Sequence, residues 1–283
     1  MVAFVILHYK NFNDTLDCIS SIKKLSGVKK IVVVDNHTLQ FDEKKQLEDT
    51  CDKLLCLKKN EGFARANNIG SRFAIENYHP DFLVVINNDT VIKQKDFLKI
   101  IQKKYLKYHF DILGPRIICE EGSGSVNPYL PLKNIEEVQK ELQVQKRLLK
   151  FYRHTFLYLG LVLYMKLKHL FVKKNVFKNG EEEMLGVALH GCALIFSKQY
   201  YHKFQNVFCE KTFLYHEESF LYLRLQQHHL ISLYSPDLEI VHKEGASLNI
   251  LYHNQRKRNL FRTQEIIKSL KILEDVMKKG EEV

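Results

Sequence analysis

The first ninety residues alternate between strand-like and helix-like segments, and this order restricts the fold more than any other feature. Continuous apolar runs rich in β-branched residues occupy 2–9, 29–36 and 82–86, as expected for strands covered on both faces. Between them, residues 13–25 carry apolar side chains at helical spacing, and 64–78 also has a helical composition. The alternation predicts an α/β fold, with helices on both faces of a mostly parallel sheet.

The composition is that of a folded protein. The 283 residues are 45% hydrophobic and 27% charged, enough for a large core in one or two domains. A formal net charge of +10 favours an anionic partner: a nucleotide, a nucleic acid or a membrane surface. The six cysteines lack the spacing of a zinc site, which favours reduced thiols. The short apolar start lacks a signal-peptide cleavage site, which predicts a cytoplasmic location.

Polar side chains follow three of the predicted strands. His8 and Tyr9 follow the first, Asp35 and Asn36 the second, and residues 87–89 (Asn-Asn-Asp) the strand at 82–86. Each group alone is consistent with a turn. Ligands of such sheets bind beyond the carboxyl ends of the strands, so three polar groups there favour a binding site.

The segment KNEGFARANNIG (59–70) adds a glycine-containing turn before a helix. Gly62 opens the turn, and Gly70 lets the helix approach a sheet or a ligand closely. Asn60 and Asn67 are suited to reading a base or ribose, or else serve as a helix cap and a surface amide. The segment is neither GxxxxGK[ST] nor GxGxxG, so it supports neither phosphate-loop proteins nor Rossmann dehydrogenases.

Taken in order, ILHYKN, VVVDN, NEGFARANNIG and VVINNDT resemble the nucleotide-sugar-binding half of family 2 inverting glycosyltransferases. The segments 189–201, 213–225 and 235–247 resemble the acceptor-binding half of these enzymes, so the resemblance covers residues 2–250. Similar bacterial enzymes extend rhamnose-containing or capsular polysaccharides. The resemblance implies the GT-A fold, which has a Rossmann-like mixed, mostly parallel central sheet. It also implies a UDP- or dTDP-linked sugar donor and a divalent cation, Mg²⁺ or Mn²⁺.

The resemblance also assigns donor-binding residues. His8, Tyr9 and Asp35 would hold the base and ribose, and residues from the turn and helix at 59–70 would line the nucleotide pocket. The full donor-binding set that it implies is His8, Tyr9, Asp35, Asn60, Gly62, Asn67, Asn87, Asn88, Asp89, His190, Gly191 and Lys243.

Asn87, Asn88 and Asp89 occupy the place of the family's DxD motif. Glycosyl transfer puts negative charge on a diphosphate leaving group, and a hard cation held by a carboxylate stabilises that charge. Here Asn87 replaces the first acid, which leaves Asp89 as the anionic ligand. The resemblance implies His242 as a second metal ligand, and Lys243 beside it would neutralise phosphate. Without the resemblance, His242 is a structural histidine near a strand end and Lys243 is a solvated lysine.

An inverting transfer also needs a base that takes the proton of the attacking hydroxyl. Glu217 and Glu218 occupy the place of the family's acidic pair, and the resemblance implies Glu218 as the base, with Glu217 as the second candidate. Many relatives have an aspartate two residues after the pair, where this chain has Phe220. Two acids at a helix start are also ordinary capping chemistry.

The segment 142–180 contains no Asp or Glu but is rich in Lys and Arg, and its apolar stretch 155–165 is too short to span a bilayer. It favours an amphipathic element at an anionic membrane surface. The alternative is a helical hairpin that caps the acceptor domain or joins a homodimer. The helical pattern at 254–279 predicts a C-terminal helix packed on the body or on another subunit.

These observations predict four parts: a nucleotide-sugar-binding half, a basic amphipathic insertion, an acceptor-binding half and a C-terminal helix, at 1–120, 121–185, 186–250 and 251–283. The leading hypothesis is a glycosyltransferase of cell-surface polysaccharide synthesis, bound peripherally to the inner face of the membrane, with a polyprenyl-diphosphate-linked saccharide acceptor. A catalytically weak or inactive nucleotide-sugar-binding protein is the main alternative. A nucleotidyltransferase would need a Gly-rich loop after the first strand. A nucleic-acid-binding protein is disfavoured because the basic residues gather beside aromatic residues in one insertion.

Overall fold

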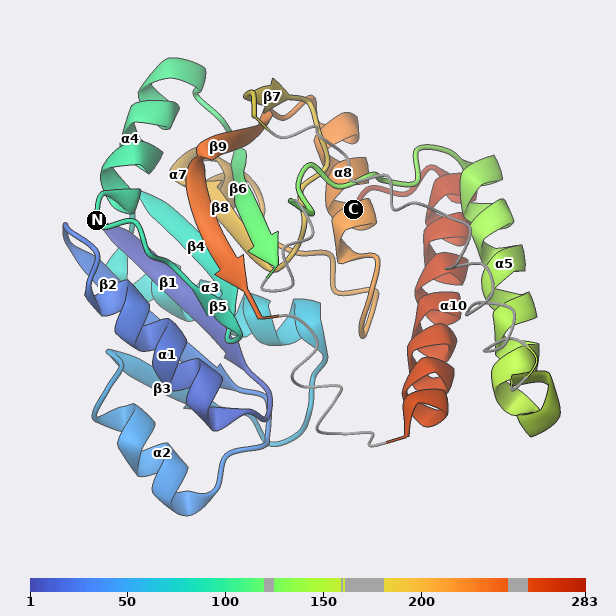
Figure 1. The fold of residues 1–283 in the computed structure, drawn as a ribbon. Helices are drawn as coiled ribbons and strands as arrows, with labels where there is room; N and C mark the ends of the chain where they lie inside the picture. The colour runs from blue at the N-terminus through green and yellow to red at the C-terminus, as the bar shows by residue number, and fades with distance from the viewer. Residues whose placement is uncertain (120–124, 159, 161–180, 244–253) are drawn as a thin grey trace.

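A mixed β-sheet forms the centre of the protein in the computed structural model (Figure 1), which describes residues 1–119, 125–158, 160, 181–243 and 254–283. Within these residues nine strands join in the order β3-β2-β1-β4-β8-β6-β9-β5, and β7 pairs with β9. The strands are β1 (Val2–His8), β2 (Lys29–Asp35), β3 (Lys53–Cys56), β4 (Phe82–Asn87), β5 (Thr90–Val91), β6 (Ile112–Cys119), β7 (Met184–Leu185), β8 (Ala193–Ser197) and β9 (Ser232–His242).

The predicted mixed, mostly parallel sheet is confirmed. Strands β3, β2, β1 and β4 are parallel neighbours, whereas β8 runs antiparallel to both β4 and β6. In the parallel part, His8 lies opposite Asp35, and Leu7 lies opposite Asn87. The polar residues that follow the strands are therefore brought to one edge of the sheet.

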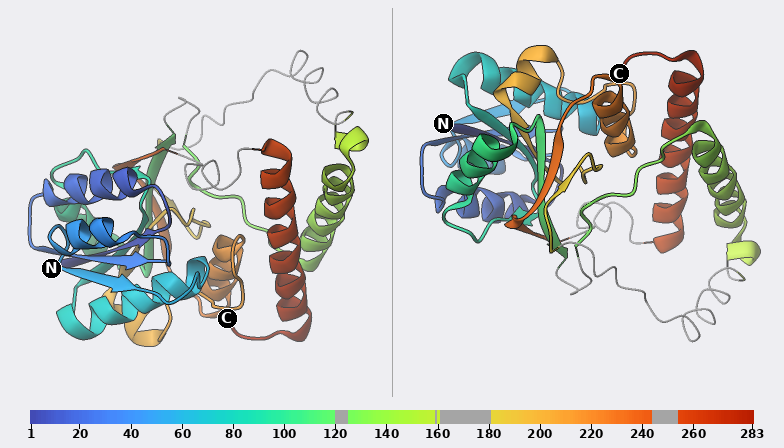
Figure 2. Two further views of the ribbon diagram at one scale, coloured as in Figure 1. Left: turned by 90° about the horizontal axis from the view of Figure 1, so that it is seen from below. Right: turned by 90° about the horizontal axis from the view of Figure 1, so that it is seen from above.

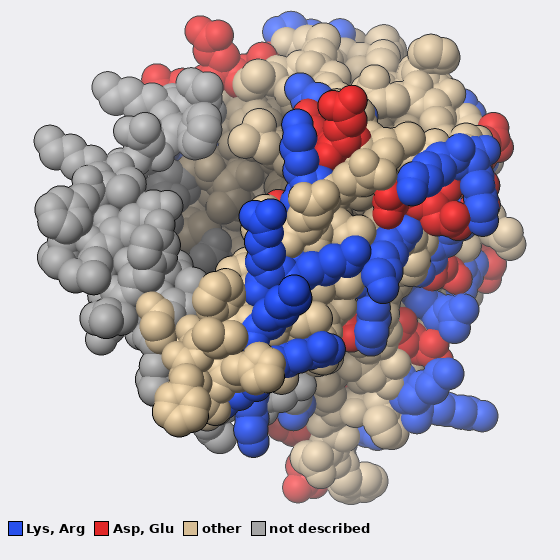
Figure 3. Space-filling view, turned by 90° about the vertical axis from the view of Figure 1, so that its right-hand side faces the viewer, with Lys and Arg blue, Asp and Glu red and all other residues tan. Residues whose placement is uncertain are grey.

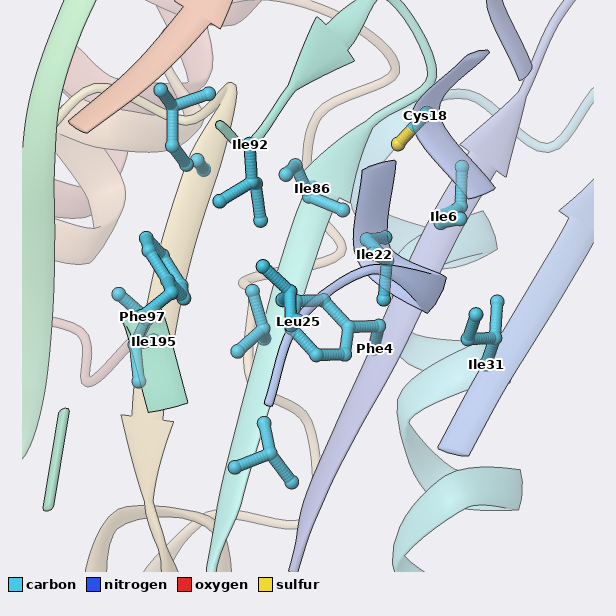
Figure 4. Close-up of a cluster of buried hydrophobic side chains, with 14 of the residues drawn as sticks. Phe4, Ile6, Cys18, Ile22, Leu25, Ile31, Ile86, Ile92, Phe97 and Ile195 are labelled. Carbon is cyan, nitrogen blue, oxygen red and sulfur yellow. The ribbon is translucent and has the colours of Figure 1, made fainter. Parts of the chain in front are cut away.

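Helices cover both faces of the sheet, which explains the continuous apolar runs in its strands. In β1, Phe4 and Ile6 face a core closed by α1 and α4, while Ala3 and Val5 face a core closed by α3, α7 and α8. Figure 4 shows the first core, with strand residues packed against Cys18, Ile22 and Phe97 of the helices. The helices are α1 (Phe12–Lys23), α2 (Phe41–Glu48), α3 (Phe63–Tyr78), α4 (Phe97–Tyr108), α5 (Ile135–Arg153), α7 (Lys198–Lys203), α8 (Glu217–Gln227) and α10 (Gln255–Lys279).

Gly70 sets the distance between α3 and the sheet. A Cβ atom at this position would lie 2.5 Å from Val34 and 2.6 Å from Val5, which are buried residues of β2 and β1. A side chain there would force the helix away from the strands. The expectation that Gly70 allows close packing of the helix on the sheet is therefore confirmed. This close packing helps to position the loop before α3.

Helices α5 and α10 pack side by side at one end of the molecule, beyond α8 (Figure 2), and we call this pair the helical arm. Its core joins Val138 and Leu142 of α5 to Leu270 and Leu273 of α10, and Phe220 of α8 completes it. C-terminal packing on the body of the protein, one of the two arrangements predicted, is therefore observed. The apolar side chain of Phe220 anchors α8 to the helical arm.

Arg256 links the start of α10 to the end of α5 through hydrogen bonds. Its guanidinium donates hydrogen bonds to the carbonyl oxygens of Tyr152 and Arg153 and to Thr155 Oγ1, at 2.7–2.8 Å. A cation at a helix C-terminus also complements the helix dipole. Most of the predicted interfacial stretch 155–165 lies outside the described residues. No helix in the described ranges is both long and apolar enough to cross a membrane.

Candidate active site

The groove at the sheet edge begins beside β1 and β2. A cavity of about 530 Å³ is lined there by His8, Tyr9, His37, Thr38 and Asn60, among others. His8 Nδ1 lies 2.7 Å from Thr15 Oγ1, and burial lowers the pKa of the imidazole. His8 is therefore a neutral group that is fixed in orientation at the wall of this cavity.

Asp35 supports the groove through its neighbouring loop. Its Oδ1 accepts hydrogen bonds from the backbone N–H groups of Thr38 and Leu39, at 2.8 and 3.2 Å. The residue is 1% exposed. In this structure Asp35 therefore orders the loop that lines the cavity, and its carboxylate is engaged by backbone.

Asn36, which the sequence placed at a strand end without a binding role, joins the second strand to the turn before α3. Its Nδ2 donates to Asn60 Oδ1 at 2.9 Å, and its Oδ1 accepts from the N–H of Glu61 at 2.8 Å. Asn60 Oδ1 also accepts from the N–H of Gly62, whose φ of 80° requires glycine. Asn60 and Gly62, two of the predicted donor-binding residues, thus lie at the groove.

Asn67 lies elsewhere. It is fully buried on α3, where its Nδ2 donates to the carbonyl oxygen of Phe63 at 3.1 Å, and it lines none of the three cavities that form the groove. Its neighbour Asn68 binds Phe208 through both amide atoms. The structure therefore gives these amides packing positions and does not bring Asn67 to the other predicted donor-binding residues.

The Asn-Asn-Asp segment after β4 is held by a dense set of hydrogen bonds. The N–H of Asn87 donates to the carbonyl oxygen of Cys192 at 2.8 Å, and Thr90 Oγ1 donates to that of Asn87 at 2.6 Å. Asn88 Nδ2 donates to Thr15 Oγ1 at 3.0 Å. Asn87, Asn88 and Asp89 line a second cavity of about 150 Å³, which shares Tyr9 and Asn60 with the first.

Asp89, just before β5, and His242, at the end of β9, lie close together. Strand β5 pairs with β9 so that Thr90 lies opposite His242, and the N–H of Lys243 donates to the carbonyl oxygen of Asp89 at 2.9 Å. This register places Asp89 Oδ1 3.1 Å from His242 Nε2, and both side chains are buried. Adjacent ligands of an octahedral ion, each about 2.1 Å from it, also lie about 3 Å apart.

The two predicted metal ligands therefore fit one divalent cation by spacing and by chemistry. Among the residues that the structure describes, no group of three or more His, Cys, Asp or Glu side chains converges. Mg²⁺ is commonly held by one or two protein ligands together with waters and substrate phosphates, so a pair is compatible with such an ion.

Lys243 is held by acidic residues of α1. Its ammonium lies 2.8 Å from Asp14 Oδ1 and 2.7 Å from Asp17 Oδ2. Burial opposes the charge, but these carboxylates outweigh it and raise the pKa of the lysine. Lys243 is a charged residue beside the metal-ligand pair, and in this structure its partners are carboxylates.

The acidic pair lies at the start of α8, beside the His190–Gly191 loop. The N–H of Gly191 donates to Glu218 Oε1 at 3.0 Å, and a Cβ at Gly191 would also lie 3.0 Å from that oxygen. Asn127 positions the loop by accepting a hydrogen bond from the N–H of His190 at 2.7 Å. Glu218 is thus held in one orientation by a backbone contact that a side chain at position 191 would crowd.

Glu217 has a different environment from Glu218. It is 7% exposed, and its Oε1 has no hydrogen-bond partner among the described residues. Burial, assisted by the nearby charge of Glu218, raises the pKa of Glu217 to about 8. Glu217 is therefore mostly protonated at neutral pH, whereas a general base must be ionised.

Both glutamates line a third cavity of about 440 Å³, which shares Phe63, Asn87 and Leu214 with the second. The three cavities form one groove that runs from His8 to the acidic pair. Sequence reasoning missed several residues that line the groove, because nothing in the local sequence marks them as site residues; these are Thr38, Phe63, Tyr129, Glu141, Gln145 and Arg262. It also missed Thr15 and Asn127, which hydrogen-bond to His8 and to the backbone of His190.

No protein-family model matches the sequence. A hexosyltransferase of low-salt glycan biosynthesis from Haloferax volcanii, Agl10, is 26% identical over 125 residues, which are 43% of this chain and 38% of the relative. The dTDP-rhamnosyl transferase RfbF of Shigella flexneri is 34% identical over 109 residues, 38% of this chain and 34% of the relative. The matched segments thus span little more than a third of either curated relative.

Solved structures match almost the whole chain. TarS of S. aureus, residues 1–349, in complex with UDP aligns with a TM-score of 0.54 at 11% identity, over 97% of this chain and 65% of that chain. GalNAc-T7 with UDP, GalNAc and Mn²⁺ aligns with a TM-score of 0.55 at 12% identity, over 97% and 54%. The chain has the GT-A fold. The resemblance to GT-A glycosyltransferases is confirmed, and the groove lies at the carboxyl edge of the GT-A sheet.

Proposed function

We propose that the protein is an inverting glycosyltransferase that moves a sugar from a UDP- or dTDP-linked donor to a saccharide acceptor. The observation that carries this proposal is the groove itself, which joins the Asp89–His242 pair to the oriented carboxylate of Glu218. The middle of the groove would supply the ligands for a diphosphate-bound cation, and the end at α8 would supply the base. The named relatives, both sugar transferases, support it.

The donor would lie with its nucleotide between His8 and Asn60 and its sugar toward Glu218. An acceptor hydroxyl oxygen attacks the anomeric carbon while its proton passes to Glu218. The bond from the anomeric carbon to the diphosphate oxygen breaks, and that oxygen keeps the electron pair. One displacement inverts the anomeric centre.

Asp89 and His242 would hold Mg²⁺ or Mn²⁺, and the ion, when bound, supplies positive charge to the departing diphosphate. Lys243 would add to the local positive potential, but it would first have to release Asp14 or Asp17 to contact phosphate directly. Because Asn87 removes one anionic ligand, we expect weaker metal binding than a site with two carboxylates would have.

The acceptor in this proposal is a saccharide on a polyprenyl diphosphate carrier, and the protein binds peripherally to the inner face of the membrane during cell-surface polysaccharide synthesis. The second half of α5 supports this part. Lys146, Arg147, Lys150 and Arg153 are exposed there, and the nearby Phe156 is 89% exposed. Figure 3 shows Lys and Arg side chains gathered across this side of the molecule.

A catalytically weak or inactive nucleotide-sugar-binding protein is the second candidate, and Asn87 in place of the first DxD acid is the observation that favours it. Such a protein would bind a donor without breaking it. Binding and hydrolysis of the donor therefore have to be measured together.

Calorimetric titration with UDP-, dTDP- and GDP-sugars, with and without Mn²⁺, tests the proposal. We expect one donor to bind, at least about tenfold more tightly with Mn²⁺, and to be hydrolysed slowly. Asp89→Asn should remove the Mn²⁺ effect, whereas Asp96→Asn, at an exposed position before α4, should keep it. If no donor binds, the proposal fails; binding without hydrolysis by the wild type favours the second candidate.

A further inference from the structure

The helical arm forms one wall of the cavity that contains the acidic pair. The wall from the GT-A body includes Tyr129, His190, Tyr215 and Glu218, and the wall from the arm consists of Glu141, Gln145, Arg262 and Ile266. The arm lies beyond α8, apart from the sheet, in Figures 1 and 2, and this cavity lies between the arm and the rest of the protein. A ligand in it would contact both.

The arm presents polar groups to this cavity. Gln145 Nε2 donates to Glu141 Oε1 at 2.7 Å, and the Arg262 guanidinium lies 5.9 Å from the ring centre of Tyr215. A carboxylate, an amide and a guanidinium together offer the hydrogen-bond donors and acceptors that vicinal hydroxyls require. A concave site with a few convergent polar groups and aromatic walls is typical of small-ligand recognition.

The charges of the cavity argue against an anionic ligand. Glu141 and Glu218 bring negative charge, and Arg262 balances one of them. Because its raised pKa keeps Glu217 mostly protonated at pH 7, that residue adds little charge and can both donate and accept a hydrogen bond. Oε1 of Glu217 is buried and has no hydrogen-bond partner among the described residues.

We infer that the helical arm is the acceptor-binding element and that it selects a neutral sugar residue, held between Gln145 and Arg262 on one side and the Glu217–Glu218 pair on the other. This inference rests on the proposed function. It adds the arm, which lies outside the donor-binding half, to the determinants of specificity. The charged part of a carrier would then lie outside this cavity.

The test uses p-nitrophenyl glycosides of neutral hexoses, deoxyhexoses and N-acetylhexosamines as acceptors, with p-nitrophenyl glucuronide as the anionic counterpart. Wild type should glycosylate at least one neutral member and not the glucuronide. Gln145→Leu and Arg262→Met should each raise the acceptor KM about tenfold, as expected when one net hydrogen bond is lost, with a smaller change in kcat. Donor affinity, measured without an acceptor, should change less than the acceptor KM.

Two matched controls separate recognition from general damage to the arm. Gln143→Leu removes the same amide from an exposed position of α5, and Lys271→Met removes a cation from an exposed position of α10; both should keep the wild-type acceptor KM. Equal KM values for Gln145→Leu and Gln143→Leu would overturn the inference, as would preference for the glucuronide or transfer to no neutral glycoside by an enzyme that hydrolyses its donor. Absence of donor binding, in contrast, would overturn the proposed function.

Discussion

Glu217 and Glu218 are adjacent in sequence but have different environments in this fold. The backbone N–H of Gly191 holds Glu218 at the cavity wall, while Glu217 is enclosed and has an oxygen without a partner among the described residues. Burial penalises the ionised form of a carboxylic acid, so the enclosed residue remains protonated at higher pH. Their environments therefore favour Glu218 over Glu217 as the proposed base, a distinction that the sequence alone does not make.

The raised pKa of Glu217 makes the stability of the protein depend on pH. The folded protein retains this proton up to about pH 8, whereas the unfolded chain loses it near pH 4.5, so ionisation costs stability as pH rises between these values. Glu217→Gln removes that cost. We expect it to raise the free energy of unfolding by about 1–3 kcal/mol at pH 8 and by less at pH 5.

Urea denaturation at the two pH values measures this difference. Glu48→Gln, at an exposed position of α2, is the control and should change stability little at either pH. A gain for Glu217→Gln that is the same at pH 5 and pH 8 would show that Glu217 is not protonated in the folded protein.

At the level of single residues, the sequence predicted the strand-end groups of the site because each follows an apolar run. The Asp89–His242 pair joins positions 153 residues apart, and only the family resemblance suggested it before the structure showed the contact. Asp35 and Asn67 illustrate the limit of such reasoning. Both are polar residues in the expected segments, but local hydrogen bonds to backbone engage them, and these bonds cannot be read from the order of residues.

Among the elements, the helical arm differs most from the sequence expectation. Strands and helices of the first half follow from hydrophobic periodicity, since a sheet covered on both faces requires continuous apolar strands. Pairing of α5 with α10 joins Val138 and Leu142 to Leu270 and Leu273, which are far apart in the sequence. Hydrophobic periodicity predicts an apolar stripe on each helix, but it does not identify the partner helix that packs against that stripe.

Helix α5 also carries the surface that we propose to contact the membrane. Reversing three of its exposed charges, in the triple variant Lys146→Glu, Arg147→Glu and Lys150→Glu, should weaken binding to vesicles with 30% phosphatidylglycerol about 100-fold or more. Each basic residue near an anionic surface contributes on the order of 1 kcal/mol, and a reversed charge is repelled.

Vesicle sedimentation measures this binding. The control reverses three exposed lysines on and beside α4, on the other side of the molecule: Lys95→Glu, Lys99→Glu and Lys103→Glu. This control variant has the same change in net charge as the α5 variant, and it should bind the vesicles more tightly. Equal binding of the two triple variants would mean that net charge, and not the surface of α5, determines the interaction.

At the scale of the whole molecule, the groove runs from the ends of the parallel strands to α8 and the helical arm, and we propose that the donor and the acceptor bind in different parts of it. Strand order brings the ends of β1, β2 and β4 together, β5 and β9 add the Asp89–His242 pair, and α8 with the arm closes the far end. The GT-A sheet therefore supports the proposed donor site, while elements outside its parallel part form the proposed acceptor site.

We propose that Glu218, and not Glu217, is the base of a transfer reaction in this groove. Hydrolysis of the bound nucleotide sugar at pH 7, with water as the acceptor, tests it most directly in Glu218→Gln and Glu217→Gln. Loss of the base should lower kcat by about 100-fold or more in Glu218→Gln with unchanged donor affinity, while Glu217→Gln stays within a few-fold of wild type. The reverse order, or equal loss in both variants, would contradict the account.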